Sequence, residues 1–152
     1  MPERLVIIPT YDERENIREI LDAVLALSPP FRVLVVDDNS PDGTAALVKE
    51  HRSTDPARIH LLERSGKLGL GTAYIAGFKW ALQHGYAYVF EMDADFSHDP
   101  KDLPRLHAAC AEGGADMSVG SRYVKGGRVH DWSWDRVLMS SMASLYVRAV
   151  LW

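Results

Sequence analysis

The sequence contains little of what marks several other classes of protein. Cys110 is the single cysteine among 152 residues, which leaves no disulfide framework and no cysteine-rich zinc site and is typical of a reducing, cytoplasmic compartment. No stretch approaches the ~18 apolar residues of a spanning helix. The first residues have only a short apolar run before charged residues begin, so we expect neither a signal peptide nor a membrane span there.

An excess of positive charge is also missing. The chain has 17 Lys and Arg against 21 Asp and Glu, a formal net charge of -4, which argues against a nucleic-acid-binding protein. The charge is unevenly distributed, because residues 1–120 carry a net -7 and residues 121–152 a net +3. The basic C-terminal part is either a solvated face or a surface suited to phosphate groups or lipid headgroups.

What is present is an ordinary globular composition, with 47% apolar and 25% charged residues. Short β-branched runs alternate with longer amphipathic ones, a pattern typical of a parallel sheet covered by helices. The runs predict strands at 4–9, 31–37, 59–63, 86–92 and 116–119, and helices at 14–27, 42–51, 71–84 and 101–110, with a further helix near the C-terminus that includes Arg136.

Polar clusters follow four of the expected strands, at residues 10–13, 37–40, 93–95 and 120–123. In open α/β sheets, ligands bind outside the carboxyl ends of the strands, near the point where the strand order reverses. We therefore expect these clusters to form one rim that is rich in acids and closed by Arg122.

Asp93 and Asp95 flank one small residue at the end of an expected strand. In an extended backbone, side chains two residues apart point to the same side of the chain, so both carboxylates can face one ion. Hard cations such as Mg²⁺ accept one or two carboxylates and take their remaining oxygens from water and substrate phosphates. The alternative is a turn or helix cap, the role that the sequence favours for Asp99 before Pro100.

The segment VVDDNSPDGT places three aspartates within six residues, so some positive group must offset their charge. For Asp42 the favoured interpretation is structural, as the residue that caps the next helix. For Asp38 the favoured interpretation is functional, because an acid at a strand end can accept hydrogen bonds from a base or a ribose.

The glycine-rich segment RSGKLGLGTAYIAG matches neither of the common phosphate-binding loop patterns. Close helix packing and a mobile loop are the favoured interpretations, with Lys67 reaching a phosphate as the alternative. The histidines show no metal-ligand spacing, and no Ser-His-Asp triad or cysteine nucleophile has local support.

The C-terminal residues predict an apolar helix with a narrow polar stripe. Arg136 and Ser140 are four residues apart on it, so they would present a cation and a hydroxyl to one anion. The helix either packs on protein beyond this chain or lies in a membrane interface, where Tyr146 and Trp152 suit the headgroup level.

In this order, the clusters resemble the polyprenol-phosphate (dolichol-phosphate) mannose synthases, which are inverting glycosyltransferases of family 2. The resemblance rests on PTYDEREN, VVDDNSPDGT, GLGTAY with Gly77, EMDADFSHDP and GSRYVKGG, followed by Trp132, Arg136 and Ser140. It implies a three-layer α/β/α Rossmann-like nucleotide-sugar fold of the glycosyltransferase A type, with a mostly parallel central sheet. Residues 1–130 would form the nucleotide-sugar-binding catalytic domain and residues 131–152 an acceptor-side amphipathic helix.

The resemblance also assigns roles to individual residues. Base and ribose would be held by Pro9, Tyr11, Glu13, Val36 and Asp38. Asp93 and Asp95 would hold Mg²⁺ or Mn²⁺ on the donor diphosphate, with Ala94 at the nucleotide and Ser97 as a polar contact near the metal. Arg122 would contact the donor, Arg136 and Ser140 would receive the acceptor phosphate, and Asp95, Arg136 and Ser140 would be catalytic. Asp12 stands where the family more usually has asparagine.

The implied reaction moves mannose from GDP-mannose to a polyprenyl (dolichyl) phosphate with inversion, on the cytoplasmic face of a membrane to which the protein is peripherally bound. A separate membrane protein is a possible anchor. The family's catalytic domain continues well past residue 152, so the chain resembles a truncated member. The alternatives are a transferase that uses a UDP-sugar and a truncated domain that binds sugar nucleotides without activity. A phosphoacceptor receiver domain is disfavoured, because its acidic pair belongs on the first strand.

Overall fold

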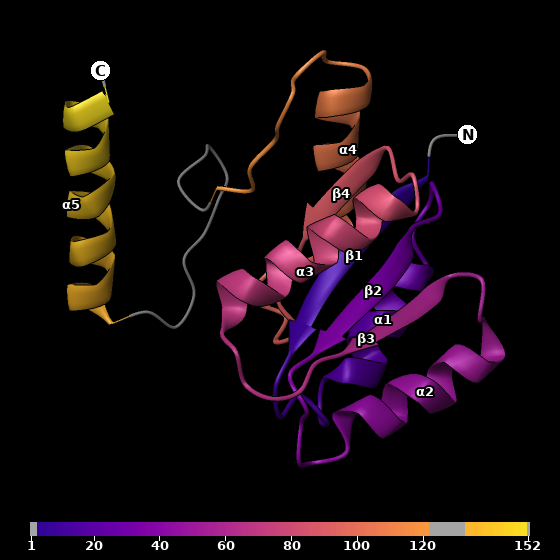
Figure 1. Ribbon diagram of the computed structural model, residues 1–152. Coiled ribbons are helices and arrows are strands. Elements are labelled where there is room, and N and C mark those ends of the chain that lie inside the picture. Colours follow the sequence, from indigo (N-terminus) through magenta and orange to yellow (C-terminus); the bar gives the residue numbers. More distant parts are fainter. Residues whose placement is uncertain (1–2, 122–132, 152) are drawn as a thin grey trace. The chain divides into compact units, whose positions relative to one another are not determined.

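The computed structural model describes residues 3–121 and 133–151, although not the side chains of Arg136, Arg148 and Leu151 (Figure 1). The chain forms two compact units, Met1–Ser118 and Val119–Trp152. The first contains β1 (Arg4–Thr10), α1 (Ile17–Leu25), β2 (Arg32–Asp37), α2 (Thr44–Thr54), β3 (Ile59–Glu63), α3 (Leu70–Gln83), β4 (Tyr88–Glu91), a 3₁₀ helix (Pro100–Asp102) and α4 (Leu103–Ala111), and the second contains α5 (Trp134–Leu151).

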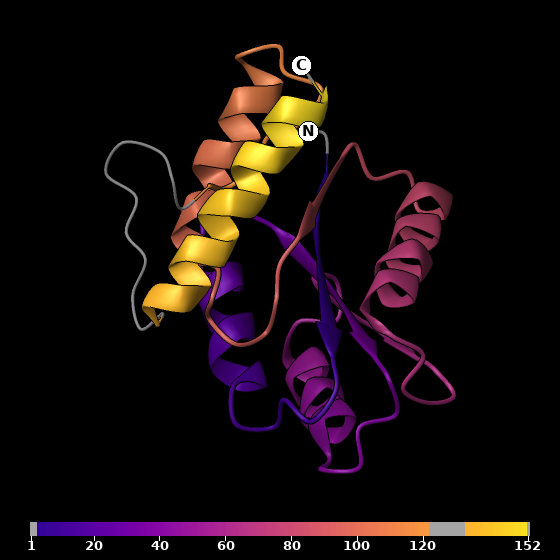
Figure 2. The ribbon, with the colours of Figure 1, turned by 90° about the vertical axis from the view of Figure 1, so that its left-hand side faces the viewer.

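The four strands form a parallel sheet in the order β3-β2-β1-β4. Alternate side chains of β1 enter two different cores, since successive residues of a strand point to opposite faces. Val6 and Ile8 pack on the face covered by α1, whereas Leu5 and Ile7 pack on the face covered by α3. Figure 2 shows α3 and α1 on opposite sides of the sheet, so the three-layer arrangement and the parallel sheet are confirmed.

Helix α1 buries Ile17, Ile20, Leu21 and Val24, the apolar stripe that the sequence predicts. It begins at Ile17 rather than at residue 14 because a turn precedes it, in which the carbonyl of Glu13 accepts hydrogen bonds from the backbone N–H groups of Asn16 and Ile17. The other boundaries shift by a few residues, as is usual where helix ends fray and strand ends lose their partners.

The strand expected at 116–119 is wrong, because these residues have no regular secondary structure. A strand of a parallel sheet must bury side chains on both faces, but Met117 and Val119 are 77% and 72% exposed. Three strand ends, not four, therefore carry the polar rim among the described residues. The domain boundary expected at residue 130 lies outside the described residues and stays a prediction.

Gly77 supports the prediction of close packing by the glycine-rich segment. A Cβ added there would lie 2.7 Å from Cγ2 and 2.8 Å from Cδ1 of Ile7, whereas one added at Gly71 in the same helix would meet no atom within 4 Å. We expect Gly77→Ala to lower the free energy of unfolding by about 1–3 kcal/mol through overpacking. Gly71→Ala is the matched control and should raise it by up to about 1 kcal/mol. Urea denaturation measures both, and equal effects would contradict the packing argument.

Helix α5 begins at Trp134 and therefore includes residues 136 and 140, as the sequence predicts. Large apolar side chains are exposed along it, namely Trp134, Leu138, Met139, Met142, Leu145, Tyr146, Val147 and Val150. The hydroxyls of Ser141 and Ser144 donate hydrogen bonds to the helix's own carbonyls at Val137 and Ser140. Among the described residues, no helix is both long and apolar enough to cross a membrane. That α5 packs on further protein or lies in a membrane interface stays a prediction.

Candidate nucleotide-binding site

The strand order reverses at β1, because the chain runs from β1 through β2 to β3 and then returns to add β4 on the other side of β1. A cavity of about 280 Å³ opens at the carboxyl ends of these strands, where such a fold binds ligands. Its lining residues are Pro9, Thr10, Tyr11, Glu13, Asp38, Lys67, Gly69, Leu70, Ala73, Asp93, Ala94 and Asp95. Seven of the predicted donor-site residues thus lie around one cavity.

Each of the three loops that follow β1, β2 and β4 has one non-glycine residue in the left-handed conformation. They are Asp12 (φ 60°), Asn39 (φ 57°) and Phe96 (φ 58°). Aspartate and asparagine tolerate this region, whereas a bulky residue such as Phe96 adopts it rarely. Such backbone strain clusters at functional sites when the surrounding structure holds it in place. Here Ser97, directly after Phe96, donates its backbone N–H to Asp95 Oδ1 at 2.9 Å.

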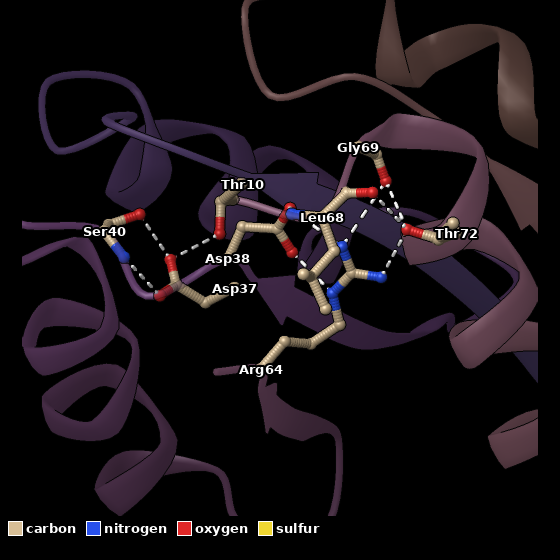
Figure 3. A network of polar contacts seen from close by, with 8 residues as sticks. All are labelled: Thr10, Asp37, Asp38, Ser40, Arg64, Leu68, Gly69 and Thr72. Carbon is tan, nitrogen blue, oxygen red and sulfur yellow. Dashed lines mark hydrogen bonds and ion pairs between the residues drawn. The ribbon is translucent and has the colours of Figure 1, made fainter. Parts of the chain in front are cut away.

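The neighbouring carboxylates of Asp37 and Asp38 have different partners (Figure 3). Asp37 is fully buried and accepts hydrogen bonds from the hydroxyls of Thr10 and Ser40 and from the backbone N–H of Ser40. These bonds join the ends of β1 and β2, which is a structural role. Asp38 lines the cavity and is the one of the two that faces a ligand site.

Arg64 forms a fork on Asp38, with Nε 2.5 Å from Oδ1 and Nη2 2.8 Å from Oδ2. The backbone N–H of Leu68 also donates to Oδ2, at 3.0 Å. Sequence reasoning missed Arg64, although the three aspartates of VVDDNSPDGT required a positive group. The available signal was its position, since Arg64 directly follows β3, the neighbour of β2 in the sheet.

Lys67 lies with its ammonium 4.0 Å from the centroid of the Tyr11 ring. Both side chains line the cavity, and a cation over an aromatic face is attracted by the ring quadrupole. The structure therefore places Lys67 at a ring that the resemblance assigns to the group of residues holding the base and ribose. Whether it reaches a phosphate when a donor binds stays a prediction.

Asp93 and Asp95 follow β4 and both line the cavity. Partial burial acts to raise the pKa of Asp95, but hydrogen bonds from the backbone and side chain of Ser97 outweigh it and lower this pKa below the ordinary carboxyl value. The backbone N–H of Asp93 donates to His98 Nδ1 at 3.2 Å, and that nitrogen lies 3.9 Å from Asp93 Oδ2.

This pair fits a divalent cation that draws most of its oxygens from a ligand. The described residues contain no group of three or more histidine, cysteine or carboxylate side chains suited to a metal, so the protein alone offers no closed cage there. Two carboxylates with open positions for water and phosphate are what Mg²⁺ commonly receives from a protein.

Tyr74 on α3 donates its hydroxyl to Asp93 Oδ1 at 3.1 Å. Burial, with the charge and the hydrogen bond of Asp93, raises the pKa of this hydroxyl, so it stays protonated and remains a donor. Removing a donor that orients a metal ligand commonly weakens metal binding by about 10–100-fold. We expect Tyr74→Phe to weaken Mn²⁺ binding in the presence of GDP by about tenfold. Calorimetry measures this effect, and unchanged Mn²⁺ affinity would show that Asp93 needs no such orientation.

Two aspartates have structural roles. Asp99 has the capping role that the sequence favours, whereas the N-cap residue of α2 is Gly43 rather than Asp42, which holds the turn before the helix. Asp42 Oδ1 accepts the backbone N–H and the hydroxyl of Thr44, the first residue of α2, and Oδ2 accepts the backbone N–H of Arg14. Asp99 caps the 3₁₀ helix by accepting the N–H of Lys101, with Pro100 at the first position. Neither lines the cavity described above.

The remaining predicted residues lie elsewhere. Val36 is fully buried in the core beneath α3, so its side chain is enclosed by apolar neighbours rather than open to a ligand. Arg122 lies outside the described residues, as does the side chain of Arg136. Ser140 belongs to α5, in the second unit. The proposed contacts of these residues with donor and acceptor stay predictions.

Comparison with known proteins agrees with this arrangement. The family model described as "Glycosyl transferase family 2" matches residues 5–148. The chain belongs to this family. Membership of glycosyl transferase family 2 confirms the family that the motifs predict.

Two relatives have names that combine mannose with a polyprenyl phosphate. The chain is 52% identical over 147 residues to a polyprenol monophosphomannose synthase of Mycolicibacterium smegmatis, covering 97% of this chain and 55% of that protein. It is 47% identical to an undecaprenyl-phosphate mannosyltransferase of Micrococcus luteus, covering 97% of this chain and 59% of that protein. The chain thus spans little more than half the length of these relatives.

A solved structure shares the fold. It is the mannosyltransferase PcManGT from Pyrobaculum calidifontis in complex with GDP-Man and Mn²⁺, with a TM-score of 0.51 and 35% identity over 62% of this chain and 28% of that one. The predicted nucleotide-sugar fold of the glycosyltransferase A type is therefore confirmed.

Proposed function

We propose that this chain is the nucleotide-sugar-binding part of a transferase that moves mannose from GDP-mannose to a polyprenyl (dolichyl) phosphate with inversion. The observation that carries the proposal is the cavity around Tyr11, Asp38, Asp93 and Asp95. The relatives named polyprenol monophosphomannose synthase and undecaprenyl-phosphate mannosyltransferase support it, as does the mannosyltransferase structure solved with GDP-Man and Mn²⁺.

In this proposal the donor nucleotide lies along the cavity. Tyr11 and Asp38 take the base and the ribose, with Pro9 and Glu13 around them, and the diphosphate lies towards Asp93, Ala94 and Asp95. Val36, whose side chain is enclosed in the core, would contribute backbone atoms alone. Asp93 and Asp95 would hold Mg²⁺ or Mn²⁺, which supplies Lewis-acid neutralisation of the diphosphate charge. Ser97 keeps Asp95 ionised through its hydrogen bonds, and Arg122 adds a further contact to the donor.

The acceptor needs little proton chemistry, because a phosphate oxygen of a polyprenyl phosphate is already anionic. It attacks the anomeric carbon on the face opposite the leaving GDP, so the new bond has inverted configuration. The residues' task is positioning and charge neutralisation. Arg136 and Ser140, four residues apart on α5, would hold the acceptor phosphate.

In this proposal the reaction takes place at a membrane surface, because the acceptor is a lipid, with the protein bound peripherally. The cytoplasmic face is what the resemblance implies. The net +3 charge of residues 121–152 suits an anionic headgroup surface. A membrane protein that anchors this domain is a possible partner, and a nucleic acid is not.

Calorimetric titration with GDP, GDP-mannose and UDP, each with and without Mn²⁺, tests the donor site. We expect Mn²⁺-dependent binding that favours the guanine nucleotides. Preference for UDP would instead assign a UDP-sugar donor. Transfer is then measured with radiolabelled GDP-mannose and a short polyprenyl phosphate, and donor binding without transfer would identify a domain that binds sugar nucleotides but is inactive by itself.

A further inference from the structure

The ion pair between Asp38 and Arg64 is buried at the edge of the cavity, with side-chain exposures of only 8% and 9%. A carboxylate has about four acceptor positions. Arg64 and the N–H of Leu68 use three of those on Asp38, one on Oδ1 and two on Oδ2. One acceptor position therefore remains, on Oδ1.

Arg64 is itself fixed from several directions. Its Nη1 donates to the hydroxyl of Thr72 at 2.9 Å, and its Nη2 is 3.4 Å from the carbonyl oxygen of Gly69. Its backbone N–H donates to the carbonyl of Asp37 at 2.8 Å. Separating a buried ion pair leaves both charges desolvated and is strongly unfavourable. A ligand that needed two acceptor positions on Asp38 would have to break this arrangement.

We propose that Arg64 is a positioning residue for nucleotide recognition, which stays on Asp38 when the nucleotide binds and leaves it a single acceptor position for one donor group of the nucleoside. The inference rests on the proposed function, since it requires that the cavity takes a nucleotide. Arg64 holds the Asp38 carboxylate in one orientation. Asp38 can then accept one hydrogen bond from the nucleoside, and it cannot accept two from a pair of base N–H groups or from both hydroxyls of the ribose.

The test measures affinity for GDP in the presence of Mn²⁺ for Arg64→Lys, Asp38→Asn and the double variant. A lysine keeps the charge but cannot span both oxygens as the guanidinium fork does. We expect Arg64→Lys to bind GDP about tenfold more weakly, the effect of losing one charge-assisted hydrogen bond. In the Asp38→Asn background the same change should add no further loss, because Arg64 acts through Asp38.

Arg58→Lys is the matched control. Arg58 lies in the turn directly before β3 and is also part-buried, but its guanidinium donates to the backbone carbonyls of Leu25 and Phe31, which do not line the cavity. The Arg58→Lys substitution should lower the melting temperature and leave the affinity of the folded protein for GDP unchanged. A merely structural role for Arg64 would give the Arg58 result.

A second measurement does not depend on how the Arg64 variant folds. GDP is compared with inosine diphosphate, which lacks the 2-amino group, and with 2′-deoxy-GDP and 3′-deoxy-GDP, on the wild-type chain and on Asp38→Asn. Each analogue lacks one hydrogen-bond donor of GDP. At most one of the three should bind the wild-type chain more weakly than GDP does and yet bind Asp38→Asn as tightly as GDP does. If two of the analogues behaved in this way, Asp38 would accept two hydrogen bonds from the nucleoside and the inference would be overturned.

The other outcomes are also decisive. Wild-type affinity in Arg64→Lys, or a further tenfold loss in the Asp38→Asn background, would overturn the positioning role and leave the proposed function intact. If the wild-type chain binds neither GDP nor UDP, the proposed function falls, and this inference falls with it.

Discussion

Asp95→Asn is expected to abolish the gain in GDP affinity that Mn²⁺ provides and to reduce mannose transfer about 1,000-fold, since a bound Lewis acid supplies several kcal/mol and each 1.4 kcal/mol is a factor of ten. Asparagine has the shape of aspartate but lacks the charge that attracts a cation. Its carbonyl oxygen can still accept the N–H of Ser97, which the aspartate does at 2.9 Å. The loop after β4 should therefore keep its conformation, and the melting temperature should not change.

Asp99→Asn is the control in the same loop. Asp99 caps the 3₁₀ helix through the N–H of Lys101, and asparagine caps helices about as well as aspartate. This variant should retain wild-type binding of Mn²⁺ and GDP. If Asp99→Asn lost as much Mn²⁺-dependent affinity as Asp95→Asn, the loop's total charge rather than one carboxylate would attract the cation. Undiminished Mn²⁺ dependence in Asp95→Asn would remove this residue from the metal site.

The elements and the acidic residues of the site were predictable because their signals are local. The buried strands β1 and β2 are continuous apolar runs that end in polar clusters, and the topological rule for parallel sheets then brings Tyr11, Asp38 and Asp93 to one edge. The roles of Asp42 and Asp99 follow from partners only two residues away. No knowledge of distant contacts was needed for any of these.

What could not be predicted depends on distant partners. Asp38 and Arg64 are 26 residues apart in the chain, and Lys67 meets Tyr11 from a different loop. The false strand at 116–119 has the same origin, since a strand forms only where a neighbouring strand accepts its hydrogen bonds and its side chains are buried. The three neighbouring aspartates predict a cation near them, but the tertiary fold alone shows that this cation is Arg64.

Tyr11→Ala is expected to weaken GDP binding by about 10–100-fold, because stacking of a base on an aromatic ring contributes about 1–3 kcal/mol. The ring is half-buried at the cavity and has the ammonium of Lys67 4.0 Å from its centroid. A cation over an aromatic ring contributes about 0.5–1 kcal/mol at an exposed site. A base that stacks more strongly than this can replace Lys67, whose flexible stem leaves the ammonium free to turn towards the diphosphate.

Tyr11→Phe keeps the ring and removes only the hydroxyl, so it should bind GDP within about twofold of wild type if stacking is the dominant contribution. Lys67→Ala separates the two roles of the lysine. If Lys67 only covers the ring, removing it strengthens GDP binding slightly, whereas if it turns to the diphosphate, binding weakens and the loss is larger for GDP than for guanosine. Calorimetry on the three variants with both ligands measures these effects. Equal affinities for GDP in Tyr11→Ala and wild type would show that the base does not stack on this ring.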